Sequence, residues 1–160
     1  MTKPKKDIRK LNLQEIEEYL NSVGEKSFRA KQIYEWLWKK NAHKFEDMTN
    51  LSKDLRSELD QVFSIDNIRV DLMQKSDDGT IKNAVKLHDG NTVESVLIPT
   101  PTRTTACVSS QVGCSLNCTF CATATLKRMR NLTAAEIVDQ VVVIDKQSRD
   151  YFKRPLSNIV

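Results

Sequence analysis

Three cysteines gathered in one short segment constrain the folding of this chain more strongly than any other sequence feature. Cys114, Cys118 and Cys121 follow a Cys-x3-Cys-x2-Cys pattern, and the fourth cysteine of the chain, Cys107, stands shortly upstream. Such clustering indicates metal or redox chemistry, because a disulfide framework would scatter its cysteines along the sequence. The segment is therefore predicted to fold as a tight loop that brings three thiolates around one centre.

Three thiolates without a fourth local ligand favour an iron-sulfur cluster with one open iron over a saturated electron-transfer cluster. An open iron can take an exchangeable molecule, which implies chemistry at the site. A structural zinc, a thiol redox pair and merely buried cysteines stay open as alternatives. Zinc would need a fourth ligand, and the two histidines, His43 and His88, lie far back in the sequence.

Hydrophobic spacing divides the chain into three predicted segments. Residues 1–65 show helical spacing and predict a small domain of three short helices, with N-caps at Asn12, Ser27 and Ser52. Residues 66–101 change to alternating apolar positions separated by Asp-Gly turn signals, which predicts a strand meander that acts as a linker.

The third segment, 102–160, predicts a strand, the cysteine loop, a helix over 134–149 and a second strand over 156–160. Thr133 and Glu136 have the spacing of a capping box and fix the start of the helix. The predicted class is thus α+β or α/β, ending in the first βαβ unit of a parallel barrel or doubly wound sheet. One such unit cannot cover both faces of a parallel sheet, so we expect a truncated catalytic domain.

With Phe120 directly before Cys121, the motif resembles that of the radical S-adenosylmethionine (SAM) superfamily. The resemblance implies a partial barrel, a [4Fe-4S] cluster held by Cys114, Cys118 and Cys121, and S-adenosyl-L-methionine chelated on the open iron. Reductive cleavage of that cofactor would supply a 5′-deoxyadenosyl radical. It also implies that Phe120 lies near the adenine of the cofactor, whereas the residues alone equally allow a core aromatic.

Longer stretches, at 103–114 and 130–140, resemble the bacterial adenine-C2 methyltransferases of 23S ribosomal RNA and transfer RNA. Residues 28–37 resemble the N-terminal domain of that family, which implies that 1–65 is an RNA-binding accessory domain. The family reaction places a methyl group on a cysteine of the protein and passes it to adenine C2 through a covalent adduct with the RNA.

Two further residues receive catalytic roles from this resemblance alone. Cys107 matches the cysteine that resolves the protein–RNA adduct, and Glu94 matches a proton acceptor. By themselves, Cys107 is equally a buried strand residue and Glu94 a carboxylate on the solvent face of a strand. The pair Lys127-Arg128 departs from the Gly-Phe-like pair of the family, which bears on the geometry of the loop.

The family's glycine-rich cofactor strand and its methyl-carrying cysteine would lie beyond Val160, so we expect the intact family member to be the enzyme and this fragment alone to be inactive. The alternatives are a non-catalytic, metal- or cluster-stabilised RNA-binding module and a radical SAM enzyme with another substrate.

Composition sets the expected partners. The net charge of +4 permits an RNA partner without requiring one. No apolar run has the length of a signal peptide or membrane span, so a soluble, cytoplasmic monomer that binds no membrane is expected. The resemblance implies 23S rRNA and tRNA as substrates and an electron donor such as flavodoxin or ferredoxin.

Overall fold

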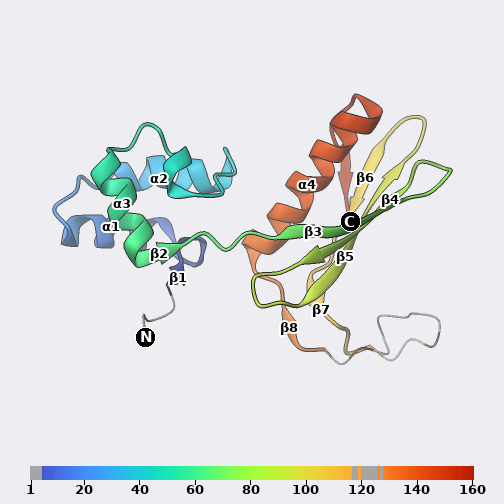
Figure 1. Ribbon diagram of the computed structural model, residues 1–160, viewed down its shortest axis with the longest axis horizontal. Helices are drawn as coiled ribbons and strands as arrows, with labels where there is room; N and C mark the ends of the chain where they lie inside the picture. Colours follow the sequence, from blue (N-terminus) through green and yellow to red (C-terminus); the bar gives the residue numbers. More distant parts are fainter. Residues whose placement is uncertain (1–4, 117–118, 120–125, 127) are drawn as a thin grey trace. The chain divides into compact units, whose positions relative to one another are not determined.

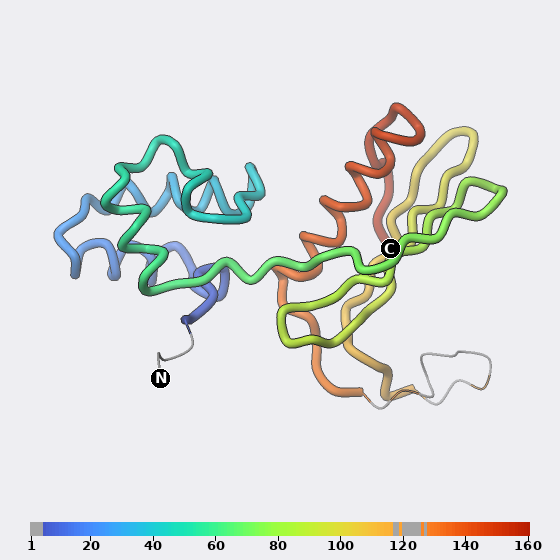
Figure 2. Tube along the Cα trace, viewed as in Figure 1, coloured from blue at the N-terminus to red at the C-terminus, as the bar shows by residue number. Residues whose placement is uncertain are grey.

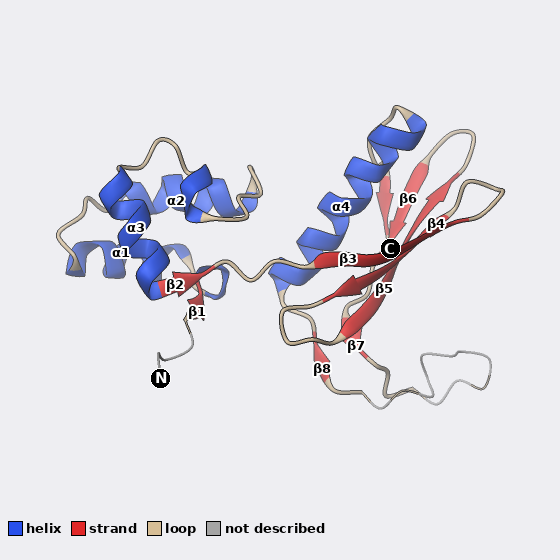
Figure 3. Ribbon diagram, in the orientation of Figure 1, coloured by secondary structure: helices blue, strands red, loops and turns tan. Residues whose placement is uncertain are grey.

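The computed structural model describes residues 5–116, 119, 126 and 128–160, and the chain divides into two compact units. The first unit spans Met1–Asp66 and the second spans Asn67–Val160. Figure 3 shows that helices dominate the first unit, whereas the second combines a sheet with one long helix. The predicted mixture of a helical part and a sheet-containing part is therefore confirmed.

Three helices and two 3-10 turns form the helical unit, namely α1 (Leu13–Ser22), α2 (Phe28–Trp38), α3 (Lys53–Val62), η1 (Ile8–Lys10) and η2 (Phe45–Asp47). Two short strands, β1 (Lys6–Asp7) and β2 (Phe63–Ser64), pair in parallel and join the beginning of the unit to its end. The apolar faces of the helices meet in one core, which includes Ile16, Leu20, Ile33, Leu55 and Leu59.

Two of the three predicted caps start helices of this unit. Asn12 Oδ1 accepts from the Glu15 N–H at 2.9 Å, and Glu15 Oε2 accepts from the Asn12 N–H at 2.7 Å. Ser52 Oγ accepts from the Leu55 N–H at 3.2 Å. The prediction for Ser27 is wrong, because its backbone is already helical (φ −55°, ψ −32°) and its hydroxyl makes no cap hydrogen bond.

Five strands form the sheet of the second unit in the order β3-β4-β5-β6-β9. Their bounds are Arg69–Lys75 (β3), Ile81–Lys86 (β4), Thr92–Pro99 (β5), Thr104–Cys107 (β6) and Asn158–Ile159 (β9). Strands β3 to β6 pair with one another in antiparallel orientation, and β9 returns beside β6 in parallel (Figure 2). The meander therefore shares one sheet with the strand that leads to the cysteine loop, while the roles assigned to the three sequence segments stay predictions.

Helix α4 (Ala134–Phe152) covers one face of this sheet and completes the predicted βαβ unit between β6 and β9 (Figure 1). Its capping box between Thr133 and Glu136 forms as predicted. Ile144 of the helix packs in a buried cluster with Ile81, Leu97 and Ala106 of three strands. The helix runs past its predicted end near 149, and β9 is shorter than the predicted 156–160.

Within the described part of the chain, no helix combines the length and apolarity that crossing a bilayer would require.

Candidate active site at the cysteine loop

Cys107 and Glu94 lie on the same face of the sheet, opposite the face that α4 covers. In the β5–β6 register Cys107 is paired with Val96, and Glu94 lies two residues from Val96 on the same strand. Side chains two apart on a strand point to the same side. Leu97 and Ala106, which alternate with these residues, face the core with α4. The sheet therefore presents both predicted catalytic residues on the face opposite α4.

The two side chains differ in their surroundings. Cys107 is a half-buried free thiol at the end of β6. The side chain of Glu94 is 58% exposed, and its Oε1 lies 2.5 Å from Nζ of Lys82 on the neighbouring strand β4. An exposed ion pair of this kind contributes at most about 1 kcal/mol to stability, so Lys82 can release the carboxylate at little cost.

A cleft of about 390 Å³ extends from Glu94 to the base of the cysteine loop. Its walls come from β4 and β5 on one side and from the segment that follows β6 on the other, with the lining residues Ala84, Thr92, Glu94, Ser109, Gly113 and Leu126. Ser109 Oγ donates to the Glu94 carbonyl at 2.7 Å and joins the two walls. A pocket of this size beside a cysteine loop can hold a small substrate or part of a cofactor.

The side chain of Gln140, buried in α4, fixes the segment between β6 and the cysteine loop. Its Oε1 accepts from the Ser109 N–H and its Nε2 donates to the Ser109 carbonyl, both at 3.0 Å. These bonds satisfy the N–H and the carbonyl of Ser109, where the backbone leaves the sheet. The only signal of this role in the sequence is a glutamine amid the apolar residues of the helix.

The base of the cysteine loop is closed by a small antiparallel pair, β7 (Gln111–Val112) with β8 (Arg130–Asn131). The pair is extended by the Met129 N–H, which donates to the Val112 carbonyl at 2.9 Å, and by the Cys114 N–H, which donates to the Leu126 carbonyl at 3.3 Å. The two limbs of the loop are thus held together on both sides of the cysteine motif.

Of the predicted cluster ligands, the structure describes Cys114 alone, since Cys118 and Cys121 lie outside the described residues, as does Phe120. Cys114 is half-buried, and its sulfur accepts a hydrogen bond from the Leu116 N–H at 3.3 Å. An N–H donor stabilises a thiolate, so this sulfur fits a cluster ligand. No group of three metal-binding side chains occurs among the described residues. The ligand set therefore stays a prediction.

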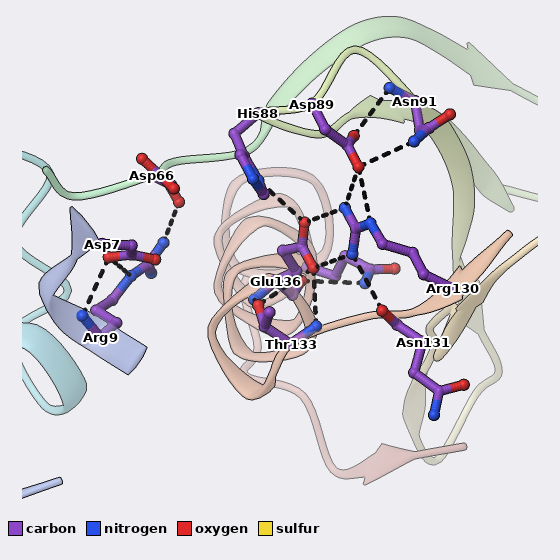
Figure 4. A network of polar contacts seen from close by, with 11 residues as sticks. Asp7, Arg9, Asp66, His88, Asp89, Asn91, Arg130, Asn131, Thr133 and Glu136 are labelled. Atoms are coloured by element: carbon purple, nitrogen blue, oxygen red, sulfur yellow. Dashed lines mark hydrogen bonds and ion pairs between the residues drawn. The ribbon is translucent and has the colours of Figure 1, made fainter. Parts of the chain in front are cut away.

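A partly buried ion-pair network around the buried Glu136 anchors the returning limb of the loop to the start of α4 (Figure 4). The Arg130 guanidinium donates to both carboxylate oxygens of Glu136, at 2.8 and 2.9 Å. It also donates to Asp89 Oδ2 at 2.7 Å, and Asp89 lies in the turn between β4 and β5. Nδ1 of His88 lies 3.3 Å from Glu136. Arg130 thus joins the start of α4, six residues further along the chain, to the β4–β5 turn, 41 residues earlier.

The network also lowers the pKa values of its two carboxyl groups, Glu136 and Asp89. Burial would raise the pKa of Glu136, but hydrogen bonds from Arg130 and Thr133 outweigh burial and lower it to about 2. Asp89 is desolvated as well, and bonds from Asn91 and Arg130 lower its pKa to about 2. Hydrogen bonding to Glu136 in turn raises the pKa of Arg130. All three groups are thus charged at neutral pH.

Comparison with known proteins finds relatives that match nearly the whole chain. The model of the ribosomal RNA large subunit methyltransferase N-terminal domain matches residues 6–65. The probable dual-specificity RNA methyltransferase RlmN of Christiangramia forsetii is 67% identical over 156 residues, which are 98% of this chain and 44% of that protein. The probable enzyme of the same name from Bacillus subtilis is 43% identical over 99% of this chain and 46% of its own length. Over nearly its whole length, the chain is thus similar to the N-terminal part of RlmN proteins.

The fold of a solved relative agrees with that similarity. The crystal structure of a radical SAM methyltransferase from Sphaerobacter thermophilus matches with a TM-score of 0.79 at 40% identity, over 96% of this chain and 45% of that one. The resemblance found in the sequence is thus confirmed. The chain corresponds to the N-terminal part of the RlmN family and spans less than half the length of these relatives. The roles of Cys107, Glu94 and Phe120 stay predictions.

Proposed function

We propose that this chain forms the N-terminal part of a radical SAM enzyme that methylates adenine C2 in 23S ribosomal RNA and in transfer RNA through a methylated cysteine. The observation that carries the proposal is the match to proteins named dual-specificity RNA methyltransferase RlmN, which extends over 98% of the chain. The sheet face opposite α4, the cleft and the cysteine loop supply a place for that chemistry.

Cys114, Cys118 and Cys121 would hold a [4Fe-4S] cluster, and Phe120 would contact the adenine of S-adenosyl-L-methionine. When bound, the cluster and this cofactor supply the electron and the radical that start the reaction. The β7–β8 pair joins the two limbs of the loop beside the cleft, which is lined by Glu94 and by Gly113, the residue before Cys114.

Glu94 and Cys107 would act on the RNA from the face of the sheet opposite α4. Glu94 would accept a proton from the adenine adduct, because its exposed carboxylate lines the cleft. Cys107, at the end of β6, would supply the thiol that resolves the covalent adduct between protein and RNA. A flavodoxin or ferredoxin as reductant, and a monomeric, cytoplasmic enzyme, belong to the same proposal.

Anaerobic reconstitution of this chain with iron and sulfide tests the cluster. We expect the absorption and paramagnetic signature of a four-iron cluster, and we expect Cys118→Ala to abolish it because two thiolates cannot hold the cluster. Cys107→Ala is the matched control, since Cys107 lies outside the motif, and it should retain the signature. Stoichiometric zinc without iron would instead support a metal-stabilised RNA-binding module.

Methyl transfer is tested with the full-length protein, reductant and SAM labelled in its methyl group, on unmodified 23S rRNA and tRNA. We expect label at adenine C2, which nucleoside analysis by mass spectrometry locates. Glu94→Gln should lower the rate without changing the reconstituted cluster, since an amide cannot accept the proton. Label on a different carbon, or no label on either RNA, would reject the assignment.

A further inference from the structure

Helix α2 and the start of α1 form an aromatic cleft in the helical unit, remote in sequence from the cysteine loop. The rings of Tyr34 and Trp38, one helical turn apart, have centroids separated by 6.0 Å and planes inclined by 44°. Tyr34 is 39% exposed, so part of its ring is open to solvent. Together with Leu13 of α1 the two rings line a cleft of about 260 Å³.

The other aromatic side chains of α2 are engaged by neighbouring polar residues. Nζ of Lys40 lies 4.1 Å from the ring centroid of Trp36, whose Nε1 donates to Asn50 Oδ1. The guanidinium of Arg29 lies 4.9 Å from the ring centroid of Phe28. In the described part of the chain no such cation covers Tyr34 or Trp38. The exposed ring of Tyr34 therefore offers a face for an external planar group, while Trp38 beside it also packs against the core of the unit.

Charged side chains at the rim of the cleft indicate which planar group fits. Lys31 and Lys39 line it, and each can contact a phosphate. Glu35 lines it as well and offers a carboxylate that accepts from an amino group but cannot donate. Aromatic faces, flanking cations and one acceptor are the groups that single-stranded RNA-binding proteins use to hold an unstacked base.

We propose that this cleft binds one unstacked nucleobase of the RNA substrate. Tyr34 stacks on one face of the base with Trp38 beside it, and Lys31 and Lys39 contact the adjoining phosphates. Glu35 accepts from an exocyclic amine, so adenine and cytosine are bound in preference to uracil, which has no such amine. The inference rests on the proposed function, in which the substrate is RNA, and adds to it a second contact away from the reacting adenine.

The test is a fluorescence anisotropy titration of this 160-residue chain with labelled single-stranded RNA homopolymers of adenosine, cytidine and uridine. Tyr34→Ala should weaken binding to the adenosine and cytidine RNAs about 5- to 100-fold, the effect of losing one base stack. Tyr34→Phe keeps the ring and should bind as the natural chain does. Phe28→Ala, on the same helix and 50% exposed, is the matched control and should change binding less than about twofold.

Glu35→Ala should remove the preference over uridine RNA without abolishing binding. Circular dichroism excludes unfolding, and Tyr34→Leu, which keeps apolar bulk without an aromatic face, separates stacking from packing. Equal losses for Tyr34→Ala and Phe28→Ala, full binding by Tyr34→Leu, or no RNA binding by the natural chain would each overturn the proposal. The methyl-transfer experiment is independent of this binding experiment. If no label appears at adenine C2 but RNA binding still depends on Tyr34, the proposed reaction is rejected and the base-binding cleft is not.

Discussion

Replacing Arg130 by methionine is expected to lower the free energy of unfolding by about 3–5 kcal/mol, the usual cost of removing one partner of a buried ion pair. The variant leaves Glu136, whose side chain is 3% exposed, without the guanidinium that contacts both its oxygens. It also removes the bond to Asp89, which ties the β4–β5 turn to the loop. Urea unfolding followed by circular dichroism measures the loss.

Arg149→Met is the matched control on α4. Arg149 also pairs with an aspartate at 2.7 Å, but its side chain is 59% exposed, so its removal should cost less than about 1 kcal/mol. The double variant Arg130→Met/Glu136→Gln should recover part of the loss, because the amide is neutral and Thr133 can still bond to it. Equal losses for Arg130→Met and Arg149→Met, or strict additivity in the double variant, would contradict a buried, coupled pair.

Sequence pattern predicts only the local part of this network. Thr133 and Glu136 are three residues apart, so their capping box follows from local spacing. The contact between Arg130 and Asp89 spans 41 residues and depends on how a loop and a turn meet in space. No regular spacing of residues in the sequence predicts the contact between Arg130 and Asp89. The carboxylate predicted as a cap therefore has a second role, as the buried anchor of the cysteine loop.

The candidate site shows the same division between local and long-range information. The strands that carry Glu94 and Cys107 follow from their alternating and apolar runs, and the family resemblance named both residues. Their common face depends on the register that pairs Val96 with Cys107, and a shift by one residue would place them on opposite faces. The prediction that Ser27 caps α2 is wrong for a local reason. A favourable residue type does not by itself set the backbone angles that a cap needs.

Acid should destabilise the sheet unit more than the helical unit. The pKa of Glu136 falls from an ordinary value of 4.5 to about 2, and that of Asp89 from 3.8 to about 2. A carboxyl with a lowered folded pKa binds fewer protons in the folded state than in the unfolded state. Its stabilisation is complete above the unfolded pKa and is lost as pH falls towards 2. For the buried Glu136 that loss is about 3 kcal/mol.

The two units can be followed separately, because both tryptophans, Trp36 and Trp38, belong to the helical unit. Tryptophan fluorescence reports that unit, and hydrogen exchange of α4 amides reports the sheet unit. Between pH 5 and 2.5 we expect the amides of α4 to lose protection against hydrogen exchange. The urea concentration at the midpoint of the tryptophan fluorescence change should move less. In Arg130→Met the pH dependence at α4 should be shallower, since without the guanidinium burial raises the pKa of Glu136. The same pH dependence with and without Arg130 would show that other carboxyl groups cause the acid sensitivity.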